Sequence, residues 1–190
     1  MAHAAPVTTR VTAERYFALV DEGVLHPDDR VELLEGVIVA MAPQSARHAA
    51  ATSRVDDALR AAIGTRAVTR VQLPLALGLY SVPEPDVAVV PGRRADYDTA
   101  HPTTGLLVVE VAEASLAQDR LTKAAIYAAA GIPEYWLVNL RDDRVEVFQA
   151  PDRQAARYGE TRLAGSGEQL ELVALPGAVV AVEDLLPRRA

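Results

Sequence analysis

The 190-residue chain has no cysteine, and its acidic residues outnumber its basic ones by 26 to 19, giving a formal net charge of −7. The lack of cysteine excludes disulfides and thiolate metal sites, so any bound ion would need oxygen or histidine ligands. A hard cation is the ion that this set of donors favours. The shortage of Lys and Arg argues weakly against tight, non-specific binding to nucleic acid. A local basic face can still exist within a negative total.

Long apolar runs are also missing. No run approaches the roughly 20 residues that span a bilayer, and the opening MAHAAPVTTR lacks the basic-then-apolar pattern of a secretion signal. We therefore expect no membrane contact and a cytoplasmic location. Half of the residues are hydrophobic and charges of both signs are present, which is typical of a globular chain. The length predicts a single domain over residues 1–190, because single cores tend to split beyond roughly 250 residues.

The hydrophobic pattern predicts a mixture of helices and strands, a mixed α+β variant of the α/β class. Thr12 caps a helix that ends near Gly23, and Ser115 with Gln118 forms a capping box for a helix to Ala130. A third helix is expected over residues 45–64. Strands are expected as a hairpin within residues 30–43, at 67–77, 86–90, 106–112, 134–140 and 144–150, and in short pieces of the tail at 158–163, 169–175 and 178–186.

One carboxylate interrupts an aliphatic run that can only be buried. Glu110 lies in the middle of LLVVEVA, and burying an unpaired carboxylate costs several kcal/mol. The following helix places Asp119, Lys123 and Tyr127 at spacings of four, on one face. Lys123 is therefore available as the partner of Glu110. The pair can be a purely structural ion pair, or it can belong to a site.

A second acid begins another buried strand. Asp86 follows Pro85 in EPDVAVV, where it can act as a simple turn residue. Two acids at the ends of adjacent strands, with a lysine nearby, describe a magnesium-type phosphodiesterase site, in which oxygen ligands hold the ion and lysine orients or activates water.

The order of several motifs resembles the Uma-two family of restriction endonucleases, within the PD-(D/E)XK nuclease superfamily. The motifs are RVELLEG, then MAP followed by His48, then PEPDVAVV, then VVEVAEASLAQDRLTKAAIYAAAGIPEYWLVNL, and they span about residues 10–150. The resemblance implies a restriction-endonuclease-like central mixed sheet flanked by helices, with additional β-hairpins. It also implies a nuclease site that uses Mg²⁺ or Mn²⁺ and acts on DNA.

The resemblance assigns roles residue by residue. Asp86 is similar to the aspartate of the PD half-motif and Glu110 to the acid of the second half. The usual lysine of the superfamily would stand at Ala112, and Lys123 replaces it from the next helix. Glu32 resembles an additional acid, and His48 the histidine after the MAP turn. The implied catalytic set is Asp86, Glu110, Lys123 and Glu32, with Asp86 and Glu110 as metal ligands and Glu32 and His48 as further candidates.

Other interpretations of these residues remain open at this point. Glu32 can lie on an exposed sheet face, and His48 can serve only a helix cap or face solvent. Tyr127, Tyr135 and Trp136 are better explained as core or interface aromatics than as base-stacking residues.

Two functions follow from the motifs. The first is a metal-dependent DNA endonuclease that hydrolyses phosphodiester bonds. The second is a non-catalytic module that keeps the nuclease fold to bind nucleic acid or protein. We also expect a homodimer, because strands at 134–140 and 144–150 would offer an exposed edge or face.

Overall fold

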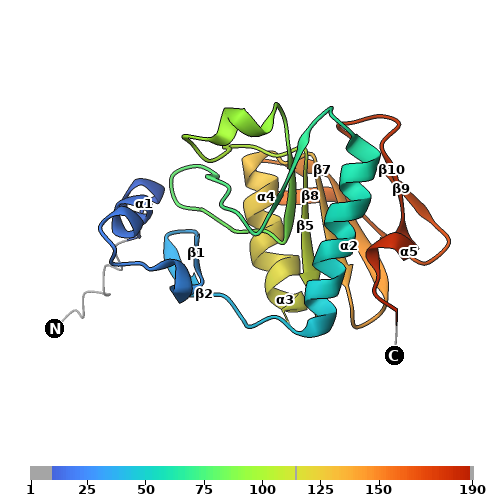
Figure 1. The fold of residues 1–190 in the computed structure, drawn as a ribbon, viewed down its shortest axis with the longest axis horizontal. Helices are drawn as coiled ribbons and strands as arrows, with labels where there is room; N and C mark the ends of the chain where they lie inside the picture. The colour runs from blue at the N-terminus through green and yellow to red at the C-terminus, as the bar shows by residue number, and fades with distance from the viewer. Residues whose placement is uncertain (1–9, 114, 189–190) are drawn as a thin grey trace.

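The computed structural model describes residues 10–113 and 115–188. Its elements alternate between short helices and strands along the chain (Figure 1). They are α1 (Ala13–Asp21), η1 (Pro27–Asp29), β1 (Val31–Leu34), β2 (Val37–Ala40), α2 (Ala46–Ile63), β3 (Val68–Val71), β4 (Val87–Val90), η2 (Arg94–Tyr97), β5 (Leu107–Ala112), α3 (Leu116–Gln118), η3 (Asp119–Lys123), α4 (Ala124–Ala130), β6 (Glu134–Asn139), β7 (Arg144–Asp152), β8 (Arg157–Ala164), β9 (Gln169–Glu171), β10 (Val179–Ala181) and α5 (Val182–Leu185). The mixed α+β fold expected from the sequence is confirmed.

A six-stranded sheet in the order β3-β4-β5-β6-β7-β8 forms the centre of the molecule. Only β5 and β6 run parallel, with Val109 opposite Trp136, and the other neighbours are antiparallel. A parallel pair needs a crossover connection. The helical segment from α3 to α4 supplies it, and this segment carries the lysine and tyrosine of interest.

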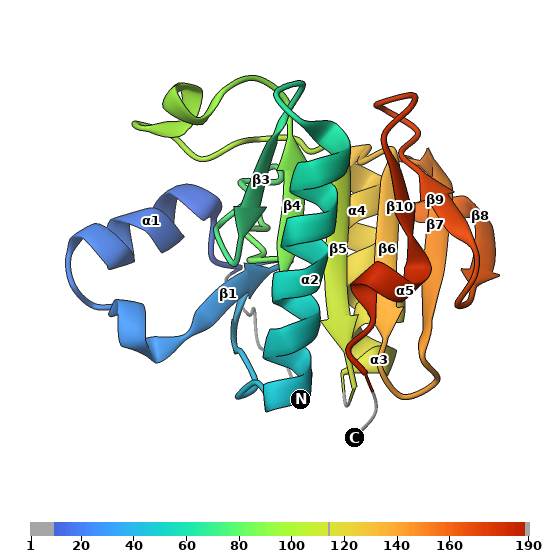
Figure 2. The same cartoon turned by 45° about the vertical axis from the view of Figure 1, so that its right-hand side comes forward.

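Alternation along β5 divides the core into two layers. Val109 and Val111 pack with α2, whereas Val108 and Ala112 pack with α4. Figure 2 shows α2 crossing one face of the sheet with α4 behind it. Because side chains alternate between faces, Glu110 points to the α4 side.

The hairpin of β1 and β2 lies with α1 at one end of the sheet (Figure 1). The Tyr16 hydroxyl of α1 donates to the Val31 carbonyl at 2.9 Å, and an antiparallel bridge joins Leu33 to Val82 just before β4. The hairpin therefore brings Glu32 next to the start of β4. The cap expected at Thr12 is present, since its hydroxyl accepts from a backbone N–H group at the start of α1, and the Ser45 hydroxyl does the same at the start of α2.

The helix expected from Leu116 to Ala130 is present, but it is not an α-helix throughout. A short α-turn leads into a π-helix, Asp119–Lys123, before α4 begins. The capping-box prediction at Ser115 was wrong, because its side chain makes no capping hydrogen bond with the helix. Such π segments insert wider turns into helices and often occur at functional sites.

Three further expectations need correction. Residues 72–77 do not extend β3, and residues 182–185 form a short helix instead of a strand. Strand β6 is buried throughout and β7 pairs on both sides, so neither offers an edge for a second copy. The edges of the sheet are β3 and β8. Dimerisation itself stays a prediction.

Candidate active site

Glu110 is the buried acid around which the site is built. Its side chain is 4% exposed. Oε1 accepts hydrogen bonds from Lys123 Nζ at 3.0 Å and from the Tyr127 hydroxyl at 2.6 Å. Within the part of the chain that the structure describes, Oε2 makes no hydrogen bond. One oxygen of Glu110 is therefore held by the crossover helix, and the other is left for a ligand.

Lys123 joins two acids instead of one. Its ammonium lies 3.0 Å from Glu110 Oε1 and 3.2 Å from Glu32 Oε1, and the lysine is 7% exposed. Glu32 is itself buried, and its Oε2 accepts from the backbone N–H of Glu84 at 3.1 Å. The alternative that placed Glu32 on an exposed sheet face was wrong. The Lys123 ammonium of the crossover segment therefore pairs with one acid from β5 and one from the β1–β2 hairpin.

Asp86 is held by three donors from three parts of the chain. Its Oδ2 accepts from the Val111 backbone N–H at 2.8 Å, a contact that follows from the antiparallel pairing of β4 with β5. Its Oδ1 pairs with His48 Nε2 at 2.8 Å and accepts from Gln72 Nε2 at 3.2 Å. These bonds orient the carboxylate, and the imidazole of His48 reaches it from the first turn of α2.

The π-helix brings Asp119 to the same place. Asp119 is 4% exposed, and burial raises the pKa of its carboxyl, with a hydrogen bond from Ser115 acting in the opposite direction. A cavity of about 100 Å³ is bounded by residues from all of these elements, including Glu32, His48, Asp86, Glu110, Asp119 and Lys123. The structure thus brings together every residue that the sequence assigned to the site.

Burial and the neighbouring charges act differently on the pKa values of Glu110 and Lys123. Burial raises the pKa of Glu110 to about 8, against the opposing effect of the Lys123 ammonium and with a further rise from Asp86. Burial alone would lower the pKa of Lys123, but Glu110 and Glu32 outweigh it, and the net pKa is raised. The lysine therefore stays cationic, and the site holds more acid than its single cation neutralises.

The sequence and the fold were compared with known protein families and solved structures. The Uma2 family model, described as "Putative restriction endonuclease", matches residues 13–183, which is most of the chain. The chain belongs to the Uma2 (Uma-two) family. The match extends beyond the range of about residues 10–150 that the motifs covered, and it includes β8, β9 and β10.

A solved structure has the same fold as this Uma2 chain. It is described as the crystal structure of a "putative nuclease belonging to DUF820" from Anabaena variabilis, with a TM-score of 0.73 and 17% sequence identity. The alignment covers 92% of this chain and 97% of that one. No curated protein matched the chain in a sequence search. The fold of this Uma2 protein is thus that of a nuclease-like structure, while the roles of its side chains rest on their own geometry.

The donor chemistry of the Uma2 site suits a hard cation, although the acids are not gathered as a preformed ligand set. Carboxylate oxygens of Asp86 and Glu110 are the ligands that Mg²⁺ prefers. Among the described residues, no three Asp, Glu or His side chains lie close enough together to hold an ion. The ammonium of Lys123 stands between Glu32 and Glu110, and His48 is turned onto Asp86.

Sequence reasoning missed two partners of the acids. Gln72 donates to Asp86, and the Tyr127 hydroxyl donates to Glu110. Tyr127 is fully buried, as are Tyr135 and Trp136, so the prediction that these three are core aromatics is confirmed. The spacing of four between Lys123 and Tyr127 could have indicated the hydroxyl contact. Nothing in the sequence around Gln72 pointed to its role.

The raised pKa of Glu110 predicts a pH-dependent stability. Between about pH 5 and 8 the unfolded chain has lost this proton while the folded chain keeps it, so the free energy of unfolding should fall as pH rises through this window. Glu110→Gln should remove that part of the slope, which is at most about 1.4 kcal/mol per pH unit. Urea unfolding in EDTA at several pH values measures it. The charged and titratable groups near Glu110 that remain in the variant are Glu32, Asp86, Asp119, Lys123 and Tyr127.

The control for this titration is Glu113→Gln, which removes an exposed acid three residues away. Its pH dependence should match that of the parent. A parent and a Glu110→Gln variant with the same slope between pH 5 and 8 would show that Glu110 ionises normally in the fold.

Proposed function

We propose that this protein is a divalent-metal-dependent DNA endonuclease that hydrolyses phosphodiester bonds. The observation that carries the proposal is the convergence of the buried side chains of Glu110, Asp86 and Lys123 around one small cavity, where Glu110 makes its hydrogen bonds through Oε1. Membership of a family described as restriction endonucleases supports nucleic acid as the substrate.

Asp86 and Glu110 would hold Mg²⁺ or Mn²⁺, with Glu32 and His48 as further candidate ligands. A bound ion supplies Lewis-acid polarisation of the phosphate and lowers the pKa of its bound water. The Val111 N–H, His48 and Gln72 keep the Asp86 carboxylate in a fixed orientation before substrate arrives. Because His48 bonds Asp86, it is proposed to orient that carboxylate as well as to be a candidate ligand.

Lys123 is proposed as the electrostatic stabiliser. Its ammonium carries a positive charge in a buried setting, where it can interact with charge that develops on the phosphate. Lys123 also contacts Glu32. It would therefore keep one anionic partner if Glu110 bound an ion instead. Glu32 is thereby proposed to support the site through the lysine and through water at the ion.

A second function is favoured by one observation. Within the described residues the acids surround an ammonium and form no ready-made metal group. The same arrangement would serve a non-catalytic nuclease-fold module in which Lys123 is a structural ion-pair partner. Metal binding separates the two functions.

The test combines thermal melting with a cleavage assay on the whole chain. Mg²⁺ or Mn²⁺ at a hundredfold excess over Kd should stabilise the fold by about 2.7 kcal/mol. The same ions should allow cleavage of supercoiled plasmid and of a single-stranded oligonucleotide, and EDTA should stop it. A melting temperature that ignores both cations at millimolar levels, together with intact DNA, would favour the non-catalytic module.

A further inference from the structure

A second, larger cavity opens beside the acidic site. It has a volume of about 570 Å³ and lies between α1, the β1–β2 hairpin and the segment before β4. The volume falls within the roughly 300–1,000 Å³ of pockets that enclose small ligands. Arg30, Met41, Gln44 and Glu84 line both this cavity and the acidic one, so the two are adjacent and share a wall. A ligand in the larger cavity would therefore lie next to the acidic site.

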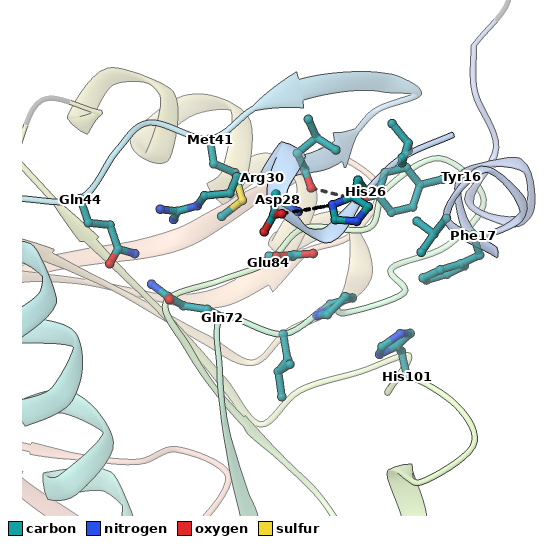
Figure 3. Close-up of a pocket in the computed structure, with 15 residues that line it drawn as sticks. Tyr16, Phe17, His26, Asp28, Arg30, Met41, Gln44, Gln72, Glu84 and His101 are labelled. Carbon is teal, nitrogen blue, oxygen red and sulfur yellow. Dashed lines mark hydrogen bonds and ion pairs between the residues drawn. The ribbon is translucent and has the colours of Figure 1, made fainter. Parts of the chain in front are cut away.

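The end of the cavity away from the acids is aromatic. Phe17 and His101 stack with ring centroids 5.2 Å apart and planes at 15°, and Tyr16 meets Phe17 edge-on. Figure 3 shows Tyr16, Phe17 and His101 at one side of the cavity, with Arg30, Gln44 and Gln72 at the other. Flat aromatic surfaces of this kind are the surfaces on which nucleobases stack.

The end near the acids is polar and holds unusual backbone. Arg30 and Gln72 have φ values of 47° and 49°, in the left-handed region that residues other than glycine seldom adopt. Backbone of this kind persists where the surrounding structure enforces it, and it gathers at ligand sites. Gln72 also donates to Asp86, which ties this wall of the cavity directly to the acid.

We propose that this cavity receives the base of an unpaired nucleotide next to the phosphate that is cut. The proposal rests on the proposed function and names its substrate class, which is single-stranded or locally distorted DNA. The base would stack on the outer face of the Phe17–His101 pair and meet the amides of Gln44 and Gln72 with its polar edge. Its phosphate would lie at the shared end, where Arg30 supplies a positive charge.

The acidic lining favours a base over a phosphate deep inside the cavity. Asp28 contributes an acidic side chain to this lining, and its carboxylate repels an anion but can accept hydrogen bonds from a base. A base that is paired and stacked within a duplex cannot enter a pocket, so it must be unpaired or extruded first, and this costs least where the duplex is already disrupted. Intact duplex is therefore the poorer ligand.

The test measures binding in EDTA, so that no DNA is cut. The probes are a fluorescent duplex, the same duplex with one bulged nucleotide, and the bulged duplex with that base removed. The protein should bind the bulged probe at least about tenfold more tightly than the plain duplex, and removing the base should abolish the gain. Phe17→Ala should weaken binding of the bulged probe at least about fivefold. Combining Phe17→Ala with the probe that lacks the base should weaken binding no more than either change alone, because both changes remove the same stacking contact.

Val24→Ala is the matched control, since Val24 is 62% exposed at the end of α1 and does not line the cavity. It should bind all three probes like the parent. His101→Ala provides a second stacking variant at an exposed residue if Phe17→Ala unfolds. Equal binding of plain and bulged duplex, or full binding of the bulge without its base, would overturn the proposal.

The same probes with Mg²⁺ separate this proposal from the proposed function. Cleavage of plain duplex with no preference for the bulge would leave the endonuclease standing and overturn the base pocket. Base-dependent binding without cleavage of any probe would support the pocket in a protein that is not a nuclease.

Discussion

Asp86→Asn and Glu110→Gln are each expected to reduce Mg²⁺-dependent cleavage by about a thousandfold or more. A bound ion contributes several kcal/mol of stabilisation to the developing charge, and each 1.36 kcal/mol corresponds to about tenfold in rate. Both substitutions keep the size of the side chain and remove one charged oxygen ligand. Single-turnover cleavage of a labelled oligonucleotide measures the loss.

The same variants should lose the rise in melting temperature that Mg²⁺ causes in the parent, because the ion would no longer distinguish folded from unfolded chains. Glu113→Gln is the control, since Glu113 is an exposed acid beside the site. His48→Ala is expected to lose only about 10- to 100-fold, as residues that orient a ligand usually do. An Asp86→Asn variant as active as the parent would exclude Asp86 from the reaction.

Lys123→Met is expected to have the largest effect on stability. The lysine is the cation shared by two buried carboxylates, 3.0 Å from Glu110 and 3.2 Å from Glu32. Above about pH 8, where folded Glu110 has lost its proton, removing one partner of this buried ion pair should cost about 3–5 kcal/mol, because a charge is left buried without compensation. Methionine keeps most of the length of the side chain, so the loss reports the charge. Urea unfolding in EDTA measures it.

Mg²⁺ should restore part of the stability of Lys123→Met, because an ion held by Asp86 and Glu110 would supply positive charge to the buried acids. The variant should still lose cleavage, since the stabilising charge next to the phosphate is gone. Arg60→Met is the matched control. It breaks an exposed pair with Asp56 on α2 and should cost less than about 1 kcal/mol. A Lys123→Met protein as stable as the parent in EDTA would show that the two acids do not depend on this cation.

Local signals were sufficient for most elements and for singling out Glu110. Thr12 caps its helix as expected, because a cap depends only on neighbouring backbone. Glu110 was identified by its chemistry, since an acid in an aliphatic strand requires a partner. The family resemblance added Glu32 and His48, which no local pattern singles out.

The sequence by itself determined which residues are buried, which acids need a partner and which family the chain resembles, since these depend on side-chain type and spacing along one segment. The tertiary structure alone decided which side chains bind each of the buried acids. Lys123 contacts Glu32 as well as Glu110 because a distant hairpin packs against the start of β4, and Gln72 reaches Asp86 through a backbone turn with positive φ. The aromatic cavity likewise arises from packing between segments that are far apart in the chain.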